Sequence, residues 1–179
     1  MTTPADVVGF WRIAGPEKWF AKSHAFDQAI ALRFEAAHLA AARGKYDSWS
    51  ASAEGALALL LLLDQFPRNL FRDSAHAYAT DGKARRVAGI AISEGFDTQV
   101  EPALQQFFCM PLMHSEDLAD QEACVALCEA AGAQQNIDYA HLHRNIIARF
   151  GRFPHRNAAM GRTTTPEEQA HLDDGGFAG

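Results

Sequence analysis

Two short passages of the chain place an arginine and an asparagine after a Phe-Pro pair. The first is Phe66-Pro67-Arg68-Asn69, preceded by Asp64, and the second is Phe153-Pro154-His155-Arg156-Asn157, preceded by Arg152. A guanidinium group is planar and permanently charged, so it can bind a carboxylate or a phosphate through two parallel hydrogen bonds. Each passage is therefore suited to binding an anion, which belongs either to a ligand or to another part of the protein.

The second passage lies in a segment without acidic residues. Between Asp138 and Glu167 the chain has five of its arginines and three of its eight histidines, but no lysine. A face that only keeps a protein in solution usually mixes the two cations, whereas arginine suits fixed geometry and partial burial. The segment therefore indicates either arginines that join helices by internal ion pairs, with Asp64 and the acids near Ser115 as partners, or a cleft that binds an anion.

Three histidines are candidates for acid-base chemistry. His143 follows Tyr139 by one helical turn and precedes Ile147 by another, which is typical of a neutral, hydrogen-bonded core histidine rather than a catalytic one. His155 is inserted between proline and arginine, where it could transfer a proton at neutral pH. His114 precedes Glu116 and Asp117, so either a carboxylate orients its ring or it is an exposed residue beside a helix cap.

The spacing of these residues does not indicate a metal or a cofactor. No HxxxH or HxxE pattern accompanies His114, and neither a Gly-rich phosphate loop nor a GxSxG motif is present. Cys109, Cys124 and Cys128 form an odd set without CxxC spacing, which favours a reducing compartment. We expect Cys124 and Cys128 to be small core residues, because free cysteine is among the most buried residue types.

Composition and charge favour a soluble cytoplasmic protein. The formal net charge of −6 argues against nucleic acid or an anionic membrane as the partner. The N-terminus lacks the basic leader of a secretory signal, and the apolar run 56–63 is far shorter than the roughly 20 residues that span a bilayer.

The elements that must position these residues are all predicted to be helices. Apolar residues recur with helical spacing, and no segment alternates with a period of two. Pro67 is expected to end one helix, and Pro111 to lie just beyond another. The predicted helices cover residues 4–13, 24–43, 50 or 52–65, 82–94, 101–108, 115–131, 136–150 and a short segment that begins at Thr165-Pro166.

Short connections between these helices favour antiparallel neighbours in a bundle or a stacked array. No change of composition divides the chain, so we predict a single domain over 1–172, followed by a frayed tail over 173–179. The five consecutive leucines 59–63 cover all sides of their helix, which should therefore be central.

Three long motifs resemble the bacterial domain-of-unknown-function family 924: LLLDQFPRNLFR at 61–72, PLMHSEDLADQE at 111–122 and HRNIIARFGRFPHRN at 143–157. The resemblance extends from Val7-Val8-Gly9-Phe10-Trp11 to the Thr-Pro-Glu-Glu helix and departs locally at Cys109-Met110. It implies an all-α fold similar to tetratricopeptide-like arrays, with no assigned activity. The motif residues that carry over are Asp64, Arg68, Asn69, His114, Glu116, Asp117, His143, Arg152, His155, Arg156 and Asn157.

Three hypotheses for these residues stay open at this point. In the first, they converge on a cleft between helices that binds a small anionic metabolite or a peptide carboxylate, with His155 or His114 as the proton-transfer group if chemistry follows. In the second, the chain is a non-catalytic module that offers a helical surface to a protein partner. In the third, the Arg-Asn motifs are structural clamps, meaning ion pairs that join helices.

Overall fold

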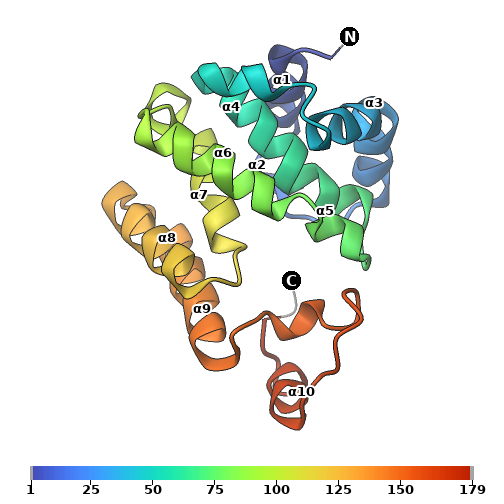
Figure 1. Cartoon of the computed structure of the whole chain (residues 1–179), viewed down its shortest axis with the longest axis vertical. Helices are drawn as coiled ribbons and strands as arrows, with labels where there is room; N and C mark the ends of the chain where they lie inside the picture. Colours follow the sequence, from blue (N-terminus) through green and yellow to red (C-terminus); the bar gives the residue numbers. More distant parts are fainter. Residues whose placement is uncertain (1, 178–179) are drawn as a thin grey trace. The chain divides into compact units, whose positions relative to one another are not determined.

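The computed structural model describes residues 2–177, which form helices joined by turns, with no strand in that range (Figure 1). The predicted all-α class is confirmed. Within the same range, no helix combines the length and the apolar character needed to cross a membrane. In chain order the elements are α1 (Pro4–Ala14), α2 (Pro16–Trp19), α3 (His24–Ala42), η1 (Asp47–Ala51), α4 (Ala53–Leu60), η2 (Leu61–Gln65), α5 (Phe66–Leu70), η3 (Ala75–Tyr78), α6 (Asp81–Ser93), η4 (Asp97–Gln99), α7 (Pro102–Met113), α8 (Leu118–Ala131), α9 (Gln134–Phe150), η5 (Pro154–Arg156) and α10 (Pro166–Asp173).

The described residues form two compact units. The first unit contains the chain up to Arg72 together with His76–Pro111, and the second contains Asp73–Ala75 together with the chain from Leu112 onward. The single domain over 1–172 and the tetratricopeptide-like arrangement stay predictions. Of the predicted frayed tail, residues 173–177 are described, with Asp173 still helical, and residues 178–179 lie outside the described range.

The first unit is organised around the leucine run. Leu59–Leu63 are each at most 1% exposed, which confirms the predicted central helix. An aromatic cluster packs beside it: the ring of Trp11 lies 5.5 Å from that of Phe66 and 5.6 Å from that of Phe107. Burial of such large rings is the main source of stability in a core of this kind.

The helix that contains the leucine run does not end before Pro67, contrary to the sequence prediction. It continues from α4 through the π-helical turn η2 into α5, and ends at Leu70. The N–H of Phe66 bonds to the carbonyl of Leu61, five residues earlier. The wider π turn accommodates the proline ring, which would otherwise meet the preceding turn of a regular α-helix.

The helix can continue because other side chains bond to its carbonyl groups. Pro67 has no N–H, so it cannot donate to the carbonyl oxygens four or five residues earlier. Nδ1 of His38 lies 2.8 Å from the Leu62 oxygen, and the Thr80 hydroxyl donates to the Leu63 oxygen at 2.5 Å. Because a carbonyl only accepts hydrogen bonds, His38 must carry its proton on Nδ1. Burial lowers the pKa of His38, although this bond opposes the shift, so the ring is neutral.

Two helix boundaries differ from the prediction for related reasons. α7 continues past Pro111 to Met113, because a proline in the last turn of a helix removes only one backbone bond near an end that already frays. α8 begins at Leu118 rather than at Ser115, because the Asp117 side chain accepts from the N–H of Ala119 and thereby caps the helix.

The second unit is built on the α8–α9 hairpin and the segment that follows it (Figure 1). Gly132, in the left-handed conformation, ends α8, and Gly151 ends α9 in the same way. After η5 the chain crosses turns to Thr165, where a capping box with Glu168 opens α10, at the predicted start of this helix. Cys124 and Cys128 are buried on α8, as predicted.

We predict that replacing Thr80 with valine lowers the free energy of unfolding by about 1 to 3 kcal/mol. The two side chains have nearly the same shape, so the change removes the donor and leaves the buried Leu63 carbonyl without that hydrogen bond. Urea unfolding followed by circular dichroism measures the effect. Thr98→Val is the matched control, because the Thr98 hydroxyl bonds to the exposed Gly95 carbonyl and water can replace it; equal losses in both variants would contradict the prediction.

Candidate functional site

The arginine of the first motif is bound inside the first unit. Arg68 donates to both carboxylate oxygens of Asp81 at 3.0 Å each, and its Nη1 lies 3.3 Å from Oδ1 of Asp64. The same nitrogen donates to the Asp64 carbonyl oxygen at 2.5 Å. Burial alone would lower the pKa of Arg68, but the charges of Asp64 and Asp81 raise it above its ordinary value. Arg68 therefore joins the π turn to α6 and remains charged.

The asparagine of the first motif also has an internal partner. Asn69 donates to Asp27 on α3 at 2.8 Å, and Arg72 binds the same carboxylate through two hydrogen bonds of 2.6 and 2.9 Å. Burial would raise the pKa of Asp27, but the hydrogen bonds from Arg72 and Asn69 lower it. These contacts join α5 to α3. They favour the clamp hypothesis for the first motif.

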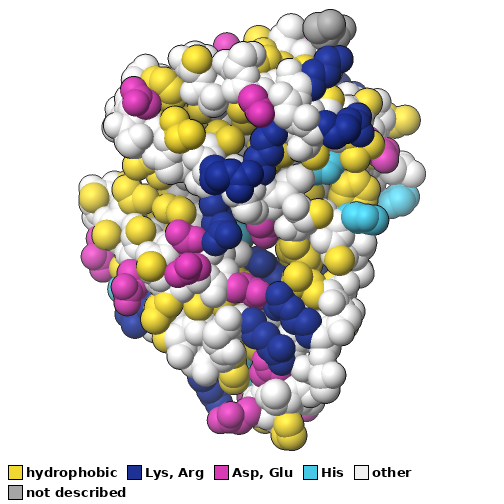
Figure 2. All heavy atoms as spheres, viewed as in Figure 1, with side chains coloured by type: hydrophobic (Ala, Val, Ile, Leu, Met, Phe, Trp, Pro, Cys, Tyr) yellow, Lys and Arg dark blue, Asp and Glu magenta, His cyan; other side chains and the backbone are white. Residues whose placement is uncertain are grey.

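Two further clamps lie in the second unit. Arg152 donates to Glu168 at 2.6 and 2.8 Å and to the Thr163 carbonyl at 2.9 Å. Glu168 is 2% exposed and also accepts from Asn157 at 3.1 Å. The hydrogen bond from Arg152 is the main reason why the pKa of Glu168 is lowered to about 2. In Figure 2, Lys and Arg side chains over this unit lie next to acidic ones.

The other clamp of the second unit involves Glu116. Arg162 donates to both of its carboxylate oxygens at 2.8 Å, and the N–H of Phe153 donates to Oε1 at 3.0 Å. Burial would raise the pKa of Glu116, but these hydrogen bonds lower it. Glu116 thus holds the start of the second motif, whereas Asp117 is exposed and caps α8.

Histidine and aromatic side chains pack together around the second motif. We call His114, His143, Phe153, His155, Arg156 and Phe177 the histidine cluster. The ring of Phe153 lies 5.4 Å from His143 and 5.5 Å from His155, and the ring of Phe177 lies 4.5 and 5.3 Å from the same two. Arg156 is 5% exposed, and its guanidinium carbon lies 4.4 Å from the centre of the Phe153 ring.

The imidazoles of His143 and His155 are both neutral at pH 7. Burial, followed by the charges of Arg156 and the neighbouring histidines, lowers the pKa of His155 to about 3. Burial also lowers the pKa of His143 to about 4, together with the charges of His114 and Arg156, although its bond to the Tyr139 carbonyl opposes the shift. That bond, with Nδ1 at 2.7 Å from the oxygen, and the burial of the side chain agree with the predicted hydrogen-bonded core histidine.

The hydrogen bonding of His155 differs from that of His143. Nδ1 of His155 is enclosed, and no group within residues 2–177 forms a hydrogen bond with it. A buried polar atom without a hydrogen bond lowers the free energy of unfolding by about 1 to 3 kcal/mol. With a pKa of about 3, the ring of His155 is neutral at pH 7, and in the tautomer that carries the proton on Nδ1 this atom can donate a hydrogen bond.

The structure brings together only part of the predicted residue set within each unit. Asp64, Arg68 and Asn69 lie in the first unit with partners on α3 and α6. The described structure also adds residues that the sequence reasoning did not single out. They are Phe177 in the histidine cluster, and Asp27, Asp81 and Glu168 as partners of the arginines and asparagines.

Comparisons with known proteins agree with the sequence resemblance. Residues 7–176 match the model of a family described as a bacterial protein of unknown function, DUF924. The solved structure of a protein of unknown function from Agrobacterium tumefaciens is similar to this chain at 50% sequence identity and a TM-score of 0.92, over 96% of this chain and 97% of that one. A search of curated proteins found no match.

We expect Arg68→Met to lower the free energy of unfolding by about 3 to 5 kcal/mol, because it removes the half-buried guanidinium that binds both Asp64 and Asp81. Denaturant unfolding at pH 7 measures the loss. Arg12→Met is the control: Arg12 pairs with Glu101, but both side chains are about half exposed, so its loss should stay below about 1 kcal/mol. Losses of similar size in the two variants would argue against a clamp at Arg68.

The Arg152–Glu168 pair predicts a dependence of stability on acid. Because folding lowers the pKa of Glu168 from 4.5 to about 2, the unfolded chain binds this proton more readily than the folded chain does. The contribution of the pair to the free energy of unfolding is therefore complete above pH 4.5 and is lost as the pH falls toward 2. We expect Glu168→Gln to be less stable than the wild type at pH 6 and to lose less stability on acidification.

Unfolding free energies measured between pH 6 and pH 2.5 test this expectation. The neighbouring change Glu167→Gln is the control, because the Glu167 side chain is 80% exposed and lies 4.0 Å from Arg149. Its pH profile should follow that of the wild type. The interpretation fails if Glu168→Gln and Glu167→Gln give the same profile.

Proposed function

The chain belongs to the bacterial DUF924 family, whose function is unknown, and we propose that its histidine cluster binds a small anion such as a carboxylate or a phosphate. The observation that carries the proposal is the enclosed Nδ1 of His155. A protein retains a buried polar atom without a partner mainly where a ligand, an ion or a water supplies the missing bond.

The charges around His155 favour an anionic ligand over a cationic one. Arg156 lies in the cluster, and its charge is one cause of the low pKa values of His143 and His155. Two carboxylates of the second unit, Glu116 and Glu168, are each bound by an arginine on both oxygens, and Glu116 also interacts electrostatically with Arg156. An anion bound here would offset the positive charge and would raise the pKa of His155.

The rings of the cluster would enclose such a ligand in an environment of low polarity. Phe153 and Phe177 contact both imidazoles, and electrostatic interactions are stronger where water is excluded. A neutral imidazole with its proton on Nδ1 can donate to a bound carboxylate or phosphate, and an anion that raises the pKa of His155 toward 7 would allow acid-base chemistry. The proposal concerns the binding of an anion at the histidine cluster and does not include a reaction. The interaction module stays an alternative prediction.

A thermal-shift titration with sodium phosphate and sodium acetate at constant ionic strength tests the proposal. We expect at least one of the two anions to raise the melting temperature of the wild type by more than 2 °C, and His155→Phe to abolish this response. Phenylalanine fills the same space and removes the enclosed nitrogen, so the variant without ligand should be as stable as the wild type or more stable by about 1 kcal/mol.

His141→Phe is the matched control, because His141 is more exposed, on α9, and pairs with Glu129. It should respond to the anions like the wild type. In parallel, the ring nitrogen signals of His155 in NMR spectra should move on anion addition, as expected for a new bond at Nδ1. The proposal is overturned if neither anion changes the melting temperature or these signals, or if His155→Phe retains the full response.

A further inference from the structure

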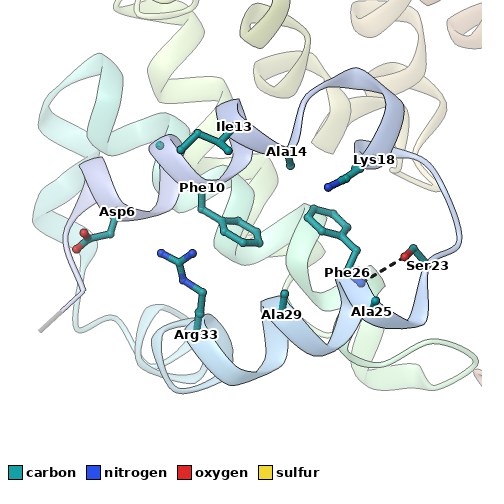
Figure 3. Close-up of a pocket in the computed structure, with 11 residues that line it drawn as sticks. Asp6, Phe10, Ile13, Ala14, Lys18, Ser23, Ala25, Phe26, Ala29 and Arg33 are labelled. Atoms are coloured by element: carbon teal, nitrogen blue, oxygen red, sulfur yellow. Dashed lines mark hydrogen bonds between the residues drawn. The ribbon is translucent and has the colours of Figure 1, made fainter.

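A pocket of about 530 Å³ lies in the first unit between α1 and α3 (Figure 3). This volume is in the range of ligand-binding pockets for small molecules. The pocket is separate from the residues of the proposed anion site, because its lining comes from the first unit alone. The residues that line it are Asp6, Gly9, Phe10, Ile13, Ala14, Lys18, Ser23, Ala25, Phe26, Ala29 and Arg33.

The walls of the pocket are mostly apolar and include two aromatic rings. Phe10 and Phe26 stack with their ring centres 5.6 Å apart and an angle of 4° between their planes. Small side chains on α3, Ala25 and Ala29, leave space beside the rings (Figure 3). Ile13 on the rim is 87% exposed. Such walls suit a flat apolar group, because aromatic rings pack well against one another in offset or edge contacts.

Gly9 keeps the α1 side of the pocket open. It lies inside a helix, where glycine costs up to about 1 kcal/mol relative to alanine. Neither of the usual structural reasons for glycine applies here, since its φ is not positive and a Cβ atom added to it would have no neighbour within 4 Å. Gly9 therefore leaves open space on the α1 side of the pocket, which a larger side chain would fill.

The polar side chains of the lining carry an excess of one positive charge. Lys18 and Arg33 are cations, and Asp6 is the acid among the lining residues. Oδ2 of Asp6 accepts from the N–H and the hydroxyl of Thr3 at 2.8 and 2.7 Å, and Arg33 is close enough to help lower the pKa of Asp6. The guanidinium of Arg33 lies 4.9 Å from the centre of the Phe10 ring.

Lys18 is the cation farther from this acid. In Figure 3 its side chain points from the opposite end of the pocket toward the ring of Phe26. The hydroxyl of Ser23 lies at the same end, where its oxygen accepts from the N–H of Phe26 at 3.3 Å and its proton can be donated to a ligand. An ammonium and a hydroxyl beside stacked rings can bind a carboxylate that is attached to an aromatic group.

We propose that this pocket binds a small aromatic monocarboxylate, with its ring beside Phe10 and Phe26 and its carboxylate on Lys18 and Ser23. The apolar walls select the ring, the excess positive charge selects the anion, and Gly9 provides the space. The pocket and the histidine cluster are independent sites, so the failure of one proposal leaves the other standing.

Isothermal titration calorimetry of the His155→Phe variant with 3-phenylpropionate tests this proposal, because that variant lacks the carboxylate site proposed for the histidine cluster. Two reference compounds separate the parts of the ligand: 3-phenylpropanamide has the ring without the charge, and propionate has the charge without the ring. We expect 3-phenylpropionate to bind at millimolar concentration or below, and each reference compound to bind at least tenfold more weakly. The proposal is overturned if 3-phenylpropionate does not bind, or if the amide binds equally well.

Matched variants place the binding in the pocket. Gly9→Leu should fill the space and abolish binding, whereas Gly89→Leu should not, although Gly89 is also an interior helix glycine with open space around it. Lys18→Met should weaken binding at least fivefold, whereas Lys22→Met, which changes an exposed lysine outside the lining, should not. His155→Phe should leave binding unchanged. Binding that survives Gly9→Leu, or that is lost in His155→Phe, would contradict the assignment.

Discussion

The fold of the first unit depends on hydrogen bonds to the carbonyl groups that precede Pro67. A proline in the middle of a central, fully buried helix would leave polar oxygens in an apolar core, where each costs about as much as a lost hydrogen bond. His38 and Thr80 donate to the Leu62 and Leu63 oxygens, and Arg68 donates to that of Asp64. The leucine run can stay central only because α3 and the start of α6 supply these donors.

Three of the clamps share one feature. The carboxylates of Asp27, Asp81 and Glu168, which bind Arg72, Arg68 and Arg152, all lie in the first turn of a helix, where backbone N–H groups already stabilise negative charge. A bidentate arginine then fixes the direction in which that helix begins. Internal clamps therefore account for Arg68, Arg72 and Arg152, and the histidine cluster carries the stronger indication of ligand binding.

The sequence predicts what local chemistry determines. Helix class, the helix starts at Pro4 and at Thr165-Pro166 and the burial of Leu59–Leu63 depend on neighbouring residues and agree with the structure. The continuation past Pro67 depends on His38 and Thr80, which lie 24 and 17 residues from the carbonyl groups to which they donate. No local pattern reveals these donors. The motifs likewise indicate that their arginines bind anions, but they do not identify Asp27, Asp81 and Glu168 as the partners. An acid in the first turn of a helix is already explained by the helix dipole, so it does not indicate an ion pair. Phe177 gave no signal, since it lies in a glycine-rich tail.

The two units differ in the interactions that hold their segments together. The first unit has an extended apolar core, whereas the turns between η5 and α10 are held by Glu116 and Glu168, beside a small cluster of Ile146, Ile147 and Phe153. Acid protonates the carboxylates of the clamps and salt screens their ion pairs, whereas apolar burial does not depend on charge. The clamped segment is therefore held most weakly where the apolar core is still strong: in acid and at high ionic strength.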